Sequence, residues 1–227
     1  IVREIHNRIQ GTTKGTQRAV FVVFESKEEL YKFYGSTDFE PLRMNALVLT
    51  EEANLQEKNN IINNATISGK ITLFTRIFGR GTDFIIHDEM VSANGGVHVI
   101  QTFLSEELSE EIQIQGRAAR QGENGSYCLI LSQLSLEKFL ITKIDIDENS
   151  SQIYELLNNK RKSFFNKQYL ESTSYVDTIR KKHENALEFL FNLLKRNESA
   201  VRTFLLDENK GTLLTGNSKT IILIDAT

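Results

Sequence analysis

Short apolar runs alternate with polar, helix-forming stretches over the first 130 or so residues of the chain. Each run has the length of a β-strand, and the stretches between consecutive runs are long enough to hold helices. Such connections are what parallel strands require. The pattern therefore predicts an α/β fold, a three-layer αβα domain with a mainly parallel sheet built from Ala19–Phe24, Ala46–Leu49, Ile71–Phe74, Gly95–Thr102 and Ser126–Leu131.

Helices are predicted before and between these strands. Isoleucines recur at helical spacing at the start of the chain, in Ile1, Ile5 and Ile9. Ser26 and Glu29 have the spacing of a capping box and predict a helix over Lys27–Tyr34. A further helix is expected over Glu51–Asn64, although its asparagines are poor helix formers.

The pattern becomes helical after Ser132. A short helical turn is expected at Glu137–Ile141, then a polar linker from Ile144 to Ser151, then two long helical segments. The basic run Lys160–Lys162 is interpreted as part of a solvated helix face. We predict three regions: an α/β domain over residues 1–140, a helical segment over 141–210, and a strand and turn over 211–227.

Two glycine- and arginine-bearing segments are the strongest candidates for chemistry. A helix starting with Ser105 as its cap and running through Arg120 would place Gln113, Arg117 and Arg120 on one face. Two guanidiniums at that spacing repel each other unless an anion lies opposite, and triphosphate oxygens match their donors. This is the chemistry of an arginine finger, a side chain that stabilises the charge on a transferring phosphoryl group.

The other segment is a glycine-rich turn after an apolar strand, the place where α/β proteins bind ligands. Gly79 and Gly81 can take positive φ and allow close backbone approach. Asp83 can accept a hydrogen bond from a ribose hydroxyl or hold an arginine. Taken alone, this segment is typical of a surface turn. The arginine segment, taken alone, is typical of an exposed helix face whose arginines form ion pairs with Glu106, Glu107 or Glu110.

Together with a third motif, the two segments resemble the second RecA-like nucleotide-binding domain of the SecA preprotein translocase family, superfamily 2 helicase-like motors. The family motifs GRGTD, GG(L)HVI and QxxGRxGRQGxxGS have counterparts, in this order, in Gly79–Asp83, Gly95–Ile100 and Gln113–Ser126. The helical tail resembles the scaffold that follows this domain in the family. Two departures are Ala119, where the family has glycine, and Leu108–Glu110, where the family has a basic stretch.

The resemblance implies roles for six residues. Arg117 and Arg120 would be catalytic and reach the γ-phosphate of ATP. Nucleotide contact and coupling to domain closure would fall to Arg80, Gly81, Asp83 and Gln113. ATP and Mg²⁺ would be held mainly by a first RecA-like domain of the same protein, because the chain has no phosphate loop and no acidic pair after an apolar strand. ATP hydrolysis is thus expected only together with that domain, and the fragment alone is expected to be inactive.

Both ends of the chain suggest a piece of a longer protein. The first helical stripe has no start signal, and the last apolar run, Ile221–Ile224, is followed at once by Asp225. Asp225 and Thr227 resemble the beginning of the metal-binding pattern of a von Willebrand A-type domain. An ordinary strand end fits these residues equally well.

Composition narrows the function classes. A net charge of −3 and a pI near 5.9 argue against nucleic acid as the main partner, and the four histidines lack metal-ligand spacing. A single cysteine excludes an intrachain disulfide and is typical of a reducing compartment, so a cytoplasmic location is expected, with at most peripheral membrane contact. No metal site is predicted.

The leading hypothesis is the C-terminal half of a SecA-like motor that couples ATP hydrolysis to protein translocation, with a polypeptide as substrate. Two alternatives remain open. The chain could be a noncatalytic interaction or scaffold module that retains the fold, or part of a nucleic-acid helicase.

Overall fold

The computed structural model of the protein describes residues 1–10, 17–119, 123–148 and 152–208. The chain divides into two compact units, Ile1–Asn166 and Lys167–Thr227. The first unit holds the sheet and all the described candidate residues. The second is helical.

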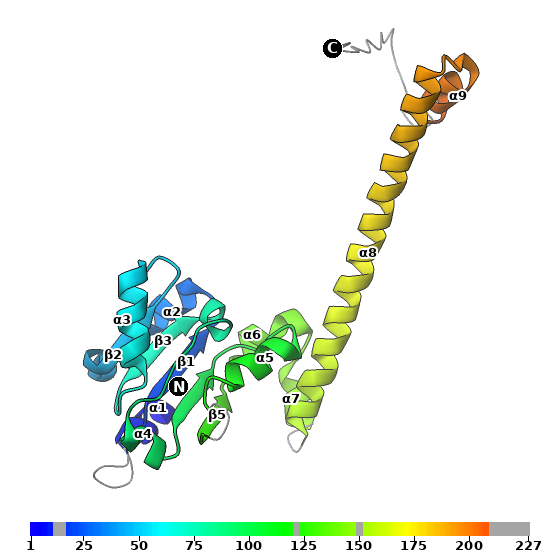
Figure 1. The fold of residues 1–227 in the computed structure, drawn as a ribbon. Coiled ribbons are helices and arrows are strands. Elements are labelled where there is room, and N and C mark those ends of the chain that lie inside the picture. The colour runs from blue at the N-terminus through cyan, green and yellow to red at the C-terminus, as the bar shows by residue number, and fades with distance from the viewer. Residues whose placement is uncertain (11–16, 120–122, 149–151, 209–227) are drawn as a thin grey trace. The chain divides into compact units, whose positions relative to one another are not determined.

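All five predicted strands form, and they pair in parallel (Figure 1). The spatial order β2-β3-β1-β4-β5 puts β1 at the centre, where Val22 is in register with both Leu73 and Ile100. Every residue of β1, β3 and β4 is buried, as expected for a parallel sheet covered on both faces. The strands are β1 (Val20–Phe24), β2 (Ala46–Leu49), β3 (Ile71–Thr75), β4 (Val97–Gln101) and β5 (Gly125–Leu129).

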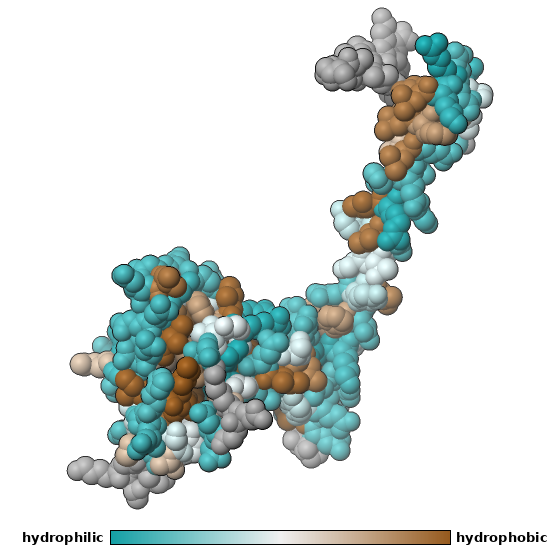
Figure 2. Space-filling model, viewed as in Figure 1, coloured by the Kyte–Doolittle hydropathy of each residue, from teal (hydrophilic) through white to brown (hydrophobic). Residues whose placement is uncertain are grey.

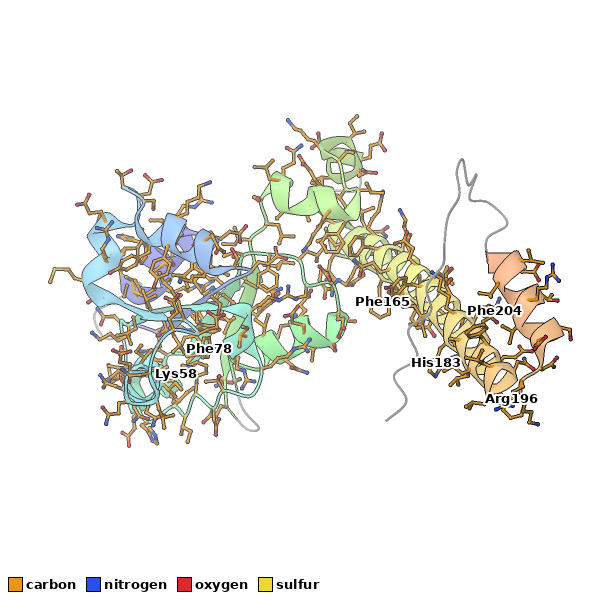
Figure 3. The ribbon with its side chains drawn as sticks, turned by 90° about the horizontal axis from the view of Figure 1, so that it is seen from above. Lys58, Phe78, Phe165, His183, Arg196 and Phe204 are labelled. Atoms are coloured by element: carbon orange, nitrogen blue, oxygen red, sulfur yellow. The ribbon has the colours of Figure 1, made fainter. Side chains whose placement is uncertain are left out.

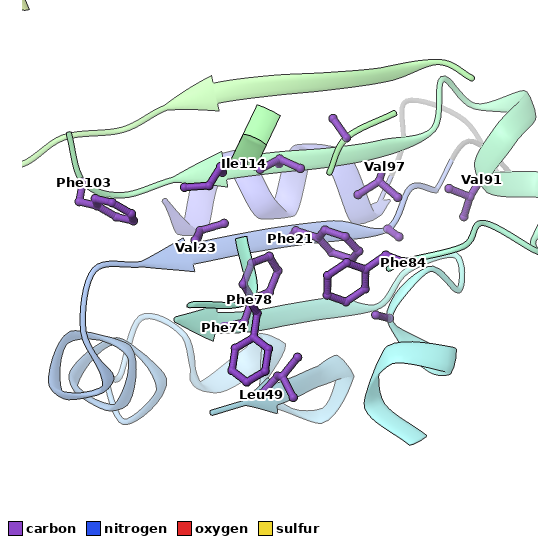
Figure 4. Packing of buried hydrophobic residues seen from close by; sticks show 14 residues of the cluster. Phe21, Val23, Leu49, Phe74, Phe78, Phe84, Val91, Val97, Phe103 and Ile114 are labelled. Atoms are coloured by element: carbon purple, nitrogen blue, oxygen red, sulfur yellow. The ribbon is translucent and has the colours of Figure 1, made fainter. Parts of the chain in front are cut away.

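Helices cover both faces of the sheet, which confirms the three-layer prediction. On one face, Ile5 and Ile9 of α1 (Val2–Gln10) and Leu30 of α2 (Lys27–Tyr34) pack against the strands, together with η1 (Glu40–Asn45). On the other face lie α3 (Leu55–Ala65), α4 (Glu89–Ala93) and α5 (Leu108–Gln115). Figure 4 shows this second core, in which Phe21 contacts Phe74 and Phe84 with ring centroids 5.6 and 4.7 Å apart.

Side-chain caps determine where the helices begin. The Ser26 hydroxyl accepts a hydrogen bond from the Glu29 amide at 3.3 Å, at the start of α2. Asn54 and Glu57 form a reciprocal capping box, so α3 begins at Leu55 rather than at the predicted Glu51.

A third core lies beyond β5, within the first unit. It joins α6 (Gln133–Leu136), η3 (Glu137–Phe139) and the first turns of α8 (Ile153–Leu194), with Leu157 packed against Leu136 and Phe139. The stretch predicted to be a polar linker contains a short helix, α7 (Lys143–Glu148). The expectation of a solvated basic run is wrong for Arg161, which is only 2% exposed because it pairs with a buried glutamate.

The second unit is a helical hairpin formed by residues 167–194 of α8 and by α9 (Glu198–Glu208). Arg196 takes a φ of 54° in the turn, and Phe189 packs against Phe204 with ring centroids 4.8 Å apart (Figure 3). Figure 2 shows apolar side chains exposed along this part of α8. The exposed large hydrophobic residues of this segment include Tyr169, Val176, Ile179 and Leu190. Within the described ranges, every helix is too short or too polar to cross a bilayer. Predictions for residues 211–227 lie outside the described residues.

Candidate functional site

The helix expected to carry all three candidate side chains is shorter than predicted. It begins at Leu108 rather than directly after Ser105. The buried Ser105 hydroxyl accepts a hydrogen bond from the Gln101 side-chain nitrogen Nε2 at 3.0 Å instead of capping the helix. It ends at Gln115, because Gly116 forms the C-cap and the Arg117 amide then bonds to the Ile114 carbonyl in a tighter turn. The prediction of one helical face is therefore wrong for Arg117, and Arg120 lies outside the described residues.

Arg117 joins the two glycine-bearing segments directly. Its Nε donates to the Gly79 carbonyl at 3.0 Å and its Nη1 to the Thr82 carbonyl at 2.5 Å. The side chain is half-buried, and burial lowers the pKa of the guanidinium. Arg117 thus places a cation at the carboxyl edge of the sheet, beside the loop that follows β3.

The loop itself depends on two glycines for different reasons. Gly79 ends η2 (Arg76–Gly79), and a Cβ there would lie 2.7 Å from Cγ1 of Ile114 on α5. Gly81 is exposed and has a φ of +68°, which side chains disfavour. Of the two properties that suit glycine, Gly81 uses the positive φ, whereas Gly79 allows the close approach of α5.

The remaining candidates lie at the surface. Arg80 is exposed, and its Nη2 is 3.7 Å from the Glu107 carboxylate, an ion pair of little stabilising value. Asp83 is exposed on the same loop, and Gln113 is exposed on α5. The structure therefore brings Arg117 together with the loop by hydrogen bonds, and Arg80 together with the residue that precedes α5.

The glutamates suggested as partners of Arg117 pair with other cations. Glu110 accepts two hydrogen bonds from Arg76, at 2.9 and 2.6 Å, and Glu106 lies 3.4 Å from Lys138. Sequence reasoning missed Arg76 because nothing in the sequence connects it with Glu110, which is 34 residues away. The one sequence feature that could have drawn attention to Arg76 is its position directly after a buried strand.

His98 and Cys128, two other titratable groups in the described part of the chain, lie in settings that do not favour chemistry. His98 is 1% exposed, and burial, reinforced by the charges of Arg8 and Arg18, lowers its pKa to about 4, so it is neutral at pH 7. Burial raises the pKa of the Cys128 thiol, which makes it a poor nucleophile. Among the residues that the structure describes, no group of three or more His, Cys, Asp or Glu could hold a metal ion.

Comparison with known proteins gives many SecA relatives. A SecA subunit of Helicobacter hepaticus is 30% identical over 223 residues, covering 92% of this chain and 24% of that protein. SecA 3 of Magnetococcus marinus is 47% identical over 77 residues, covering 34% of this chain and 12% of the relative. No protein-family model matches the chain.

The chain belongs to the SecA family. Its α/β unit is a three-layer αβα domain in which all five strands pair in parallel. The SecA-like chain spans a quarter or less of the length of the relatives that it matches. A solved structure, domain 2 of the DEAD-box helicase Mss116p bound to an RNA duplex, is 19% identical with a TM-score of 0.44, covering 58% of this chain and 48% of that one. That TM-score is too low to add to the assignment.

Proposed function

We propose that the chain is the C-terminal half of a SecA-like ATP-driven motor, which completes an interdomain ATP site and couples hydrolysis to protein translocation. The observation that carries this proposal is the position of Arg117. Its guanidinium is half-buried at the carboxyl edge of the sheet and is hydrogen-bonded to the Gly79–Asp83 loop. Two motif segments more than thirty residues apart in sequence thus form one surface.

The donor set of this surface fits phosphate oxygens. Arg117 has five N–H donors, and two of them donate hydrogen bonds to loop carbonyls. Arg80 supplies a second guanidinium, which is exposed. Gly81 lacks a side chain, so the backbone there can approach a ligand closely. Mg²⁺ does not fit the described residues, since they offer no acidic cluster. It would be held by the first RecA-like domain, where it would neutralise charge on the phosphates.

Within this arrangement each residue has a distinct task. Arg117 and Arg120 would donate hydrogen bonds to γ-phosphate oxygens as negative charge redistributes in the transition state. Arg80 and Asp83 would contact the nucleotide and make the loop sensitive to whether it is bound. Gln113 would line the same surface from α5. Water would be excluded when the two RecA-like domains close.

The decisive experiment replaces Arg120 by Ala in the full-length protein. We expect ATP turnover to fall by a factor of about 10³ or more while ATP affinity changes far less, because an arginine finger acts mainly on the transition state. Exposed Arg180, which pairs only with Asp177 among the described residues, provides the matched control as Arg180→Ala. Unchanged turnover in the Arg120 variant would reject the finger role.

A noncatalytic scaffold is the second candidate. The bonds of Arg117 to two loop carbonyls favour it, because they give this arginine a structural task that needs no nucleotide. A full-length protein without a phosphate loop upstream of this chain would support the scaffold over the motor.

Substrate class is tested separately. With a net charge of −3 the chain has no basic excess for nucleic acid, so we propose a polypeptide substrate. The single cysteine fits a reducing compartment, and we propose a cytoplasmic site of action. ATPase activity stimulated by an unfolded polypeptide and not by RNA is the expected result. Stimulation by RNA alone would favour a helicase.

A further inference from the structure

Two consecutive glutamates on α5 are buried, an arrangement that requires explanation. Glu110 is 3% exposed and Glu111 is fully buried. A buried carboxylate is costly unless it is paired and hydrogen-bonded. Because neighbouring residues on a helix point about 100° apart, the two carboxylates reach different parts of the first unit.

Glu110 connects α5 to the loop side. Its carboxylate receives both hydrogen bonds of the Arg76 fork, which raise the pKa of that guanidinium. Arg76 opens η2, the turn that leads directly into Gly79, and its guanidinium carbon lies 5.4 Å from the ring centroid of Phe103. The start of the candidate loop is therefore fixed to the first turn of α5.

Glu111 connects the same helix to the first turns of α8. One of its oxygens accepts a hydrogen bond from the Tyr154 hydroxyl and the other from Arg161 Nη2, both at 2.5 Å. Tyr154, Leu157 and Arg161 follow one another at helical spacing, so a single face of α8 carries the contact. Among the described residues, Nε and Nη1 of buried Arg161 have no hydrogen-bond partner, which leaves Glu111 as its one carboxylate.

Arg117 lies just beyond the other end of this short helix. Since α5 spans eight residues, roughly 12 Å, a shift or rotation at Glu110 or Glu111 is carried to the turn at Gly116. Ile114, packed under Gly79, transmits the same movement to the loop. The position of Arg117 against the Gly79 and Thr82 carbonyls thus depends on both ion pairs.

We propose that Glu110 and Glu111 are positioning residues that hold Arg117 against the Gly79–Thr82 loop. Arg76 anchors α5 from the loop side, and Arg161 with Tyr154 anchors it from α8. The loop and the first turns of α8 are thereby joined through one rigid helix. The catalytic consequence rests on the proposed function, whereas the placement of Arg117 does not.

The placement can be measured on the 227-residue chain without nucleotide. NMR measures the hydrogen exchange rate of the Arg117 Nε–H group in the original chain and in the variants Glu110→Gln and Glu111→Gln. The signal is assigned by its loss in Arg117→Lys. Each variant should speed exchange by about tenfold, because the loss of one charge-assisted anchor loosens α5. Tyr154→Phe, which removes one of the two anchoring bonds of Glu111, should give a smaller increase.

Two further variants separate positioning from general stability. Leu30→Ala empties part of the core on the opposite face of the sheet and should lower the melting temperature without altering Arg117 exchange. The double swap Arg76→Glu with Glu110→Arg should restore slow exchange even if Glu110→Gln folds poorly. The proposal is overturned if Arg117 exchange follows melting temperature alone, so that Leu30→Ala speeds it as much as a glutamate variant of equal melting temperature does.

A kinetic readout in the full-length protein distinguishes this inference from the proposed function. Glu111→Gln should reduce kcat for ATP by about tenfold with little change in KM, because a displaced Arg117 weakens only transition-state contacts. If Arg117→Ala leaves turnover unchanged while the exchange results hold, the motor role fails and the positioning role stands. If the exchange results fail while Arg117→Ala abolishes turnover, the reverse applies.

Discussion

Arg76 reaches from η2 to Glu110 near the start of α5, and Arg117 reaches from just beyond the end of α5 to the Gly79–Thr82 loop, but their electrostatic settings differ. Arg76 meets a buried carboxylate in a two-bond fork, and the pKa of its guanidinium is raised. Arg117 donates to two carbonyl oxygens, and burial lowers its pKa. A guanidinium matched by a carboxylate is already neutralised, whereas one held by carbonyls retains its attraction for an anion. Arg76 therefore has the setting of a structural residue and Arg117 that of a ligand-binding one.

The largest stability effect should come from Arg76. Arg76→Met leaves the Glu110 carboxylate buried without its main cation, which should lower the free energy of unfolding by about 3 kcal/mol. Urea denaturation of the 227-residue chain measures this loss. Arg117→Met should cost clearly less, since the carbonyls that it leaves behind are neutral. Equal losses would remove the distinction between the two arginines.

Unlike the two arginines, His98 is a buried basic group that is uncharged at pH 7. Its folded-state pKa of about 4 lies below the ordinary value near 6.5, so the unfolded chain binds the proton first as pH falls. Stability is therefore complete above pH 6.5 and declines towards pH 4. We expect about 2 kcal/mol less at pH 5 than at pH 7. His98→Gln should flatten this slope, and a slope that survives the substitution would assign it to other groups.

Gly79 and Gly81 separate close packing from backbone strain within the same loop. Gly79→Ala places a Cβ 2.7 Å from Ile114 and should destabilise the chain by about 1–2 kcal/mol. Gly81→Ala meets no atom within 4 Å and should cost only about 1 kcal/mol, from its positive φ. Thermal unfolding gives the ranking. A larger loss at Gly81 would mean that the contact with α5 does not constrain the loop.

Much of this fold could be predicted because its signals are local. Five apolar runs bounded by helix formers predicted the five parallel strands correctly, and Ser26 predicted where α2 starts. The end of α5 was missed because Gly116, tolerated inside a helix at modest cost, instead forms its C-cap. Arg161 was misassigned because charged residues in a basic run are usually solvated, and its buried partner lies 50 residues earlier.

The sequence predicted which residues are candidates for the site, but not how they are arranged. The ordered motifs identified Arg117, Arg80 and Asp83 as candidates. Helical spacing could not predict that the Arg117 side chain would bond to the carbonyls of the Gly79–Asp83 segment. Long-range ion pairs such as that of Glu110 with Arg76 depend on which segments the sheet order brings together.

Single-turnover ATP hydrolysis by full-length Arg117→Ala tests the central claim most directly. We expect the hydrolysis rate at saturating ATP to fall by a factor of about 10³ or more, while ATP affinity and melting temperature stay close to those of the Arg180→Ala control. Hydrolysis at the control rate, with the fold intact, would show that this arginine serves the loop alone and that the chain does not complete an ATP site through it.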